Sequence, residues 1–84
     1  MLTVEYSNQA LKFFKRMDKA LCERLLKKIE GLRNNPFPED VKKVEGYKEK
    51  IYRVRVGDYR ILYEVDRSKN FLGIVKIDHR GRAY

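Results

Sequence analysis

Cysteine and histidine are almost absent from this chain of 84 residues, which contains one of each, Cys22 and His79. A single cysteine excludes an internal disulfide, and one cysteine with one histidine is too few for the usual zinc site. Cys22 lies among Leu21, Leu25 and Leu26, a setting typical of a packed core residue rather than a nucleophile. We therefore expect neither a metal ion nor a cofactor.

Long apolar stretches are also missing. The sequence has no apolar run that could span a bilayer, no signal-peptide pattern, no internal repeat and no low-complexity tract. These absences predict a cytoplasmic protein without a membrane partner. The length allows one hydrophobic core and not two, so we expect residues 1–84 to form a single domain.

Acidic residues are outnumbered, with 12 Asp and Glu against 20 Lys and Arg and a formal charge of +8. The excess is uneven. Residues 1–41 carry eight basic and six acidic side chains, whereas residues 42–84 carry twelve basic and six acidic ones. The second half can thus attract a polyanion, although a basic surface that only keeps the protein soluble explains the charge equally well.

The first half reads as a strand followed by two helices. Residues 2–6 alternate between apolar and polar and predict a strand. Ser7 or Asn8 can cap a first helix that ends near Met17, and Asp18 can cap a longer second helix. The prolines of the segment 34–38 end that helix. Residues 36–50 lack periodicity and are expected to form a connection with a turn at Gly46.

Residues 51–66, IYRVRVGDYRILYEVD, predict a β-hairpin around Gly57-Asp58, a pair that suits a type II′ turn. This turn sets Val56 opposite Tyr59 and Arg55 opposite Arg60, with successive pairs on alternate faces. One face is then apolar, and the other carries Arg53, Arg55 and Arg60. Because like charges directly opposite each other destabilise a sheet, an anionic partner gives a reason for this placement that stability does not.

A last strand over residues 71–77 completes the sheet. We pair it so that Phe71, Val75 and Ile77 join the apolar face and Lys76 lies beside Arg60 on the basic face. The predicted fold is therefore α+β: an N-terminal strand, a two-helix hairpin and a three-stranded antiparallel meander. The helices cover the apolar face of the sheet and leave the basic face open.

An open basic sheet with an aromatic residue at its rim suits single-stranded RNA, since guanidinium groups bind phosphates and a tyrosine stacks on an unpaired base. It also suits cleavage by the 2′-hydroxyl of the RNA itself, which needs a base, cations for the crowded phosphorane and an acid for the leaving oxygen. Arginine supplies the cations well and the base badly, because it stays protonated.

The segment KVEGYKEKIYRVRVGDYRILYEV, together with the terminal RGRAY, resembles toxins of the RelE/ParE superfamily, and the RelE branch in particular. The resemblance covers nearly the whole chain. It implies a microbial-ribonuclease-like fold, metal-independent cleavage of messenger RNA in the ribosomal A site, and a cognate RelB-like antitoxin that neutralises the toxin. Messenger RNA on the ribosome and the antitoxin are thus the expected partners.

The resemblance also assigns roles. Arg53 and Arg55 correspond to basic residues of the first hairpin strand, and Arg60 corresponds to the arginine that stabilises the phosphate. Arg80 matches the arginine near the leaving group, and Tyr84 matches the tyrosine that stacks on or orients the base. Lys76 and Arg82 are candidates for RNA binding. The alternatives are that Tyr84 belongs to a disordered tail and that Arg82 only balances charge there.

The identity of the general base is left open. Well-understood relatives have lysines where Arg53 and Arg55 stand, and an arginine does not readily act as a base. His79 is a candidate because imidazole is the side chain most often used as a general base, but it is expected to point away from Arg80, and a histidine packed at the sheet's end is the simpler interpretation. Glu45, Glu49 and Glu64 are weaker candidates. Two other functions remain open: a ParE-type inhibitor of DNA gyrase without nuclease activity, and an RNA-binding module that does not cleave.

Overall fold

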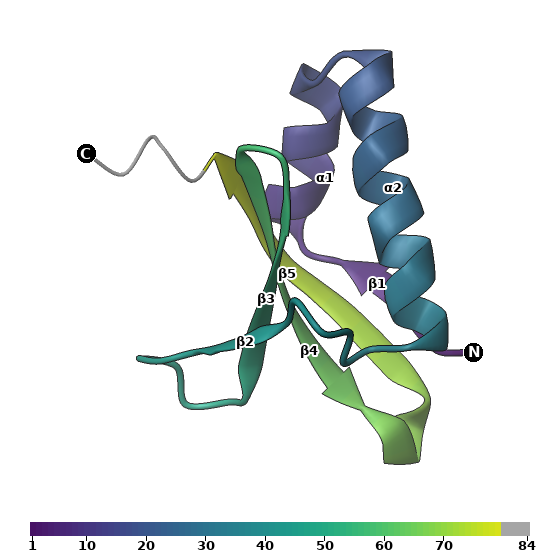
Figure 1. The fold of residues 1–84 in the computed structure, drawn as a ribbon, viewed down its shortest axis with the longest axis vertical. Helices are drawn as coiled ribbons and strands as arrows, with labels where there is room; N and C mark the ends of the chain where they lie inside the picture. Colours follow the sequence, from purple (N-terminus) through teal and green to yellow (C-terminus); the bar gives the residue numbers. More distant parts are fainter. Residues whose placement is uncertain (80–84) are drawn as a thin grey trace.

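The computed structural model describes residues 1–79 and has the predicted α+β order. Strand β1 (Thr3–Tyr6) precedes helices α1 (Asn8–Arg16) and α2 (Lys19–Asn34), and a short 3-10 turn, Arg67–Lys69, joins the last two strands. The remaining strands are β2 (Lys42–Val44), β3 (Ile51–Val56), β4 (Tyr59–Asp66) and β5 (Phe71–His79). All five strands form one sheet in the order β1-β5-β4-β3-β2, with both helices on the same side of it (Figure 1).

Both helices begin at the side chains that the sequence predicts. The Ser7 hydroxyl accepts a hydrogen bond from the Ala10 amide at 3.1 Å, and an Asp18 carboxylate oxygen accepts one from the Leu21 amide at 2.8 Å. Each bond satisfies an N–H group that has no partner within its helix. None of the helices in residues 1–79 is long and apolar enough to cross a membrane.

The central hairpin has the predicted register. Val56 pairs with Tyr59 and Arg55 with Arg60, and the ladder continues to Tyr52 and Tyr63. Gly57 has a φ of +58°, whereas Asp58 has no positive φ, which fits a type II′ turn and not type I′. The turn chemistry of two residues therefore fixes which side chains share a face.

Two strand pairings at the edges of the sheet were not predicted. Strand β1 pairs in parallel with β5, from Thr3 with Phe71 to Tyr6 with Ile74. Strand β2 lies inside the segment expected to be a connection and pairs in antiparallel fashion with β3. Because β2 is only three residues long and two of them are lysines, it leaves no alternating pattern in the sequence.

The predicted faces of β5 are wrong for Phe71 and Val75. Leu62 pairs with Lys76 but Tyr63 pairs with Ile74, so Val75 is an extra residue that forms a β-bulge. The bulge shifts the alternation by one residue, which puts Leu72 and Ile74 in the core together with Ile77. The core requires this shift, because strict alternation back from Ile77 would turn Leu72 and Ile74 away from the helices.

The core lies between the helices and the sheet. Helix α2 supplies an apolar stripe that packs against side chains of β3, β4 and β5. These core side chains are Leu21, Leu25, Ile29, Leu32, Val54, Ile61, Tyr63, Leu72, Ile74 and Ile77. The hydroxyl of Tyr63 donates to the carbonyl of Pro36 at 2.6 Å, and burial raises the pKa of this tyrosine, so it stays protonated.

Candidate nucleic-acid interface

A pocket of about 400 Å³ lies on the face of the sheet that the helices leave open. We call it the basic pocket. Its charged lining comes from β2, the loop after it, and β3, β4 and β5. The basic side chains are Lys42, Lys43, Arg53, Arg60 and Lys76, and the acidic ones are Glu45 and Asp78. An excess of positive charge in a concave site favours an anionic ligand.

The strand register explains how these residues meet. Lys42 pairs with Arg53, Arg53 with Leu62, and Leu62 with Lys76, so four strands place them in one row on the open face. Leu62 is only 7% exposed and lies outside the main core, where it forms an apolar floor beneath the charges. Lys42 and Arg53 lie directly opposite each other, and two like charges in this position destabilise a sheet unless an anion lies near them.

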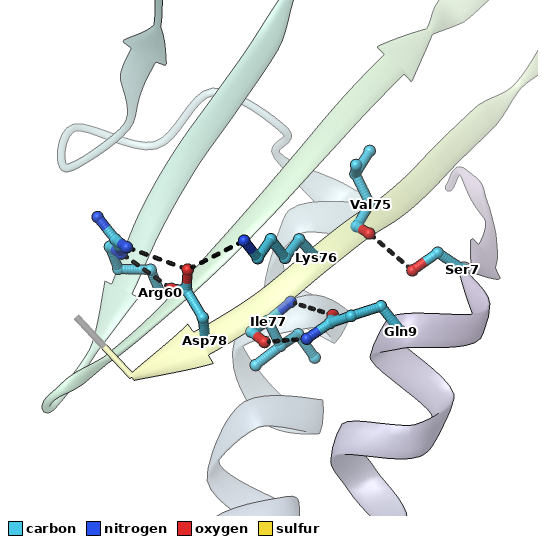
Figure 2. A network of polar contacts seen from close by, with 7 residues as sticks. All are labelled: Ser7, Gln9, Arg60, Val75, Lys76, Ile77 and Asp78. Carbon is cyan, nitrogen blue, oxygen red and sulfur yellow. Dashed lines mark hydrogen bonds and ion pairs between the residues drawn. The ribbon is translucent and has the colours of Figure 1, made fainter. Parts of the chain in front are cut away.

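The next row contains Arg55, Arg60 and Asp78, which pair in that order across β3, β4 and β5. Arg60 donates from Nε to Asp78 Oδ1 at 2.9 Å and from Nη2 to Asp78 Oδ2 at 3.0 Å. Lys76 Nζ lies 3.8 Å from the same Oδ2 (Figure 2). Lys76 lies on the basic face with Arg60, as expected, but the residue directly opposite Arg60 is Asp78, and Lys76 pairs with Leu62.

The bulge at Val75 also sets the direction of Lys76 and Asp78. With Leu72 and Ile74 in the core, an unbroken alternation would place both charged residues on the helix side. The extra residue turns them to the open face instead, as bulges near functional sites often do. One local irregularity thus satisfies the core and supplies two side chains to the basic pocket.

Arg55 is placed differently from Arg53 and Arg60. Its side chain lines a separate groove of about 500 Å³ next to α2, together with Arg24, Lys27 and Lys28. The pairing of β2 ends at Arg53, so β3 is an edge strand at Arg55 and its side chain can turn toward that edge. The structure therefore brings Arg53 and Arg60 into one pocket and Arg55 into another.

His79 lies on the helix side of the sheet. It pairs with Tyr59, and the two rings meet edge to face with centroids 4.9 Å apart. Both line a third pocket, of about 730 Å³, which runs around the end of β5 and is also lined by Arg60 and Asp78. His79 thus reaches the rim of the site from the opposite side of the strand, in agreement with the packed histidine that we considered.

The other candidates divide between three places. Glu45 lines the basic pocket, and Glu64 pairs with Gly73 near the other end of β4. Glu49 lies in the segment between β2 and β3. The predicted site residues Arg80, Arg82 and Tyr84 lie outside the described residues.

Sequence reasoning missed three charged residues of the basic pocket, Lys42, Lys43 and Asp78. Lys42 and Lys43 were missed because β2, the strand that contains them, was not predicted. A signal for Asp78 did exist, because it follows Lys76 by two positions and a strand places such residues on the same face.

Comparison with known proteins identifies the family of this chain. Residues 4–84 match a family model described as the ParE toxin of the type II toxin-antitoxin system parDE. The chain belongs to the RelE/ParE toxin family. It is a RelE-like toxin of a toxin-antitoxin system.

Two archaeal relatives resemble this toxin in sequence. The protein is 34% identical over 84 residues to the toxin RelE1 of Methanocaldococcus jannaschii, covering 96% of this chain and 92% of that protein. The RelE–RelB complex from Pyrococcus horikoshii contains a chain that is 35% identical, with a TM-score of 0.82 and 98% coverage of each chain. Isolated RelE from Escherichia coli has a TM-score of 0.81 at 21% identity, covering 99% of this chain and 88% of that one, and supports the fold alone.

Proposed function

We propose that this RelE-like toxin cleaves messenger RNA in the ribosomal A site and so inhibits translation in the cytoplasm. The observation that carries the proposal is the basic pocket on the open face of the sheet, in which Arg53, Arg60 and Lys76 surround an apolar floor. Both helices pack on the other face of the sheet (Figure 1), so neither helix blocks an RNA backbone from reaching this pocket.

In the proposed reaction, the 2′-hydroxyl attacks the adjacent phosphate, and the bond to the 5′-oxygen breaks. Negative charge builds up on the phosphorane, and fixed cations stabilise it more than they stabilise the ground state. Arg60 and Arg53 are suited to this role because guanidinium groups bind phosphate oxygens bidentately, and Lys76 adds a point charge. By resemblance, Arg80 assists the leaving group and Tyr84 orients the base.

The same proposal includes a RelB-like antitoxin as partner. The relative from Pyrococcus horikoshii was solved as a RelE–RelB complex, and the similar fold of this chain supports an equivalent complex. The net charge of +8 favours an acidic antitoxin. Co-expression with the product of an adjacent small acidic reading frame should suppress toxicity and give a stable complex, whereas harmless overexpression of the toxin alone would contradict this part.

The nuclease activity can be tested on translating ribosomes by mapping the 5′ ends of transcripts. Arg60→Ala should lower the cleavage rate about 100- to 1,000-fold, as expected when one group that stabilises transition-state charge is removed. Arg80→Ala should have a similar effect. Lys69→Ala removes a positive charge from the 3-10 turn, outside the basic pocket, and is the matched control. If both arginine variants remain as toxic as the parent, the site assignment is wrong.

The matching family model is described as a ParE toxin, which favours the second candidate that the sequence resemblance left open, a ParE-type inhibitor of DNA gyrase. Such a toxin would bind gyrase and leave RNA intact. Induction would then cause DNA-damage signalling with uncut transcripts. The nuclease predicts the reverse, cut transcripts before any DNA-damage signal.

A further inference from the structure

The carboxylate of Asp78 lies inside a pocket that otherwise attracts anions, and none of the proposed steps uses it. Both of its oxygens accept hydrogen bonds from Arg60, at 2.9 and 3.0 Å, and Lys76 Nζ lies 3.8 Å from one of them. The side chains of Arg60 and Asp78 are 25% and 24% exposed. This pair is therefore better shielded from water than an ordinary surface ion pair.

We propose that Asp78 is a positioning residue that orients the guanidinium of Arg60 for an RNA phosphate. The inference rests on the proposed function and deepens it. A guanidinium held at Nε and Nη2 by two parallel bonds cannot rotate about its last bonds without breaking them. An approaching phosphate then meets a guanidinium whose plane is already set, and less conformational entropy is lost on binding.

The strand that carries Asp78 is itself fixed on both sides. Beyond the end of β1, the N-cap residue Ser7 and the first turn of α1 take the place of a neighbouring strand along β5. The Ser7 hydroxyl donates to the Val75 carbonyl at 2.6 Å. The Gln9 side chain donates to the Ile77 carbonyl at 2.7 Å and accepts from the Ile77 amide at 2.9 Å (Figure 2). Ile77 lies directly between Lys76 and Asp78, so these bonds hold the backbone that aims both side chains.

A different role for Asp78 makes the opposite prediction. A carboxylate that only neutralises Arg60 competes with the substrate phosphate, and its removal then raises anion affinity and activity. A carboxylate that positions Arg60 raises the rate of the chemical step, and its removal lowers kcat. The sign of the change therefore separates the two roles.

The test compares Asp78→Ala and Asp78→Asn with the parent in the ribosome assay. Misplacement of one catalytic group by about 1 Å can cost about 100-fold, so Asp78→Ala should lower kcat about 10- to 100-fold with a smaller change in KM. Asp78→Asn keeps one oxygen that can accept from Nε and should lose less activity. Glu23→Gln removes one negative charge from the exposed side of α2 and should leave kcat unchanged. A gain in kcat for either Asp78 variant would overturn the proposal.

A second measurement does not depend on nuclease activity. The Nε–Hε signal of Arg60 in a nitrogen-15 NMR spectrum should be sharp in the parent and shift when inorganic phosphate is added. In Asp78→Ala this signal should broaden or disappear, while amide signals of the core stay in place. An unchanged Arg60 signal would overturn the proposal even if kcat falls. If the parent does not cleave RNA on ribosomes, the proposed function fails, and the NMR result still decides whether Asp78 orients Arg60.

Discussion

The two faces of the hairpin β3–β4 differ in what they contact, although they are built from alternate residues of the same strands. On the helix side, Val54, Ile61 and Tyr63 are completely buried against α2 and its neighbours. On the open side, Arg53 and Arg60 line a pocket with Leu62 as its floor. Burial of the first face stabilises the fold, and the backbone held in this way fixes where the side chains of the second face project. Each charged side chain is held in place by the buried neighbours that flank it in the strand.

The difference between the two faces is tested by truncating two adjacent residues, one on each face. Ile61→Ala should lower the free energy of unfolding by about 2 to 5 kcal/mol, because it leaves a closed cavity in the core. Leu62→Ala should cost less, about 1 to 3 kcal/mol, because the space it leaves opens into the basic pocket and fills with water. Urea unfolding of both variants measures the difference. Equal losses would mean that the open face is packed as tightly as the helix side.

The hairpin and the helix starts were predictable because their causes are local. A Gly-Asp pair fixes the turn, the turn fixes the register, and Ser7 and Asp18 cap their own helices. The β-bulge at Val75 was not predictable in the same way. It exists because Leu72, Ile74 and Ile77 must all reach one core, a requirement that appears only when β1 and the helices are in place.

The candidate site shows the same division. Placing Arg53 opposite Leu62 and Arg60 opposite Arg55 needed only the turn. Whether an arginine side chain then stays over the sheet depends on the neighbouring strand. The unpredicted β2 reaches as far as Arg53, which lines the basic pocket, and stops short of Arg55, which lines the groove beside α2.

The side chain of Gln9 attaches α1 to β5, and one substitution can remove this attachment. Gln9→Ala deletes two hydrogen bonds to Ile77 and should lower the free energy of unfolding by about 1 to 3 kcal/mol. Gln9→Glu is the matched variant, because a carboxylate can still accept from the Ile77 amide but cannot donate to its carbonyl. Hydrogen exchange of the Ile77 amide should be fastest in Gln9→Ala. If exchange stays at the parent's rate, the side chain of Gln9 does not hold this part of β5.

The smallest expected change in the free energy of unfolding concerns an ion pair that lies on neither face of the hairpin. Lys28 Nζ lies 2.9 Å from Asp40 Oδ2, with side chains 29% and 50% exposed, and such pairs contribute about 0.2 to 1 kcal/mol. Asp40→Asn should therefore cost no more than this, in contrast to changes at the better shielded pair of Arg60 and Asp78.

The pH dependence of the same pair gives a test of sign. The hydrogen bond from Lys28 lowers the pKa of Asp40 below its usual value of 3.8. A lowered pKa adds stability above the unfolded pKa and loses it as the pH falls through the folded pKa. The parent should thus exceed Asp40→Asn in free energy of unfolding at about pH 7 and lose that advantage by about pH 2, as measured by urea unfolding. A difference that grows on acidification would show that Asp40 acts through something other than its charge, because protonation removes the charge and leaves the side chain in place.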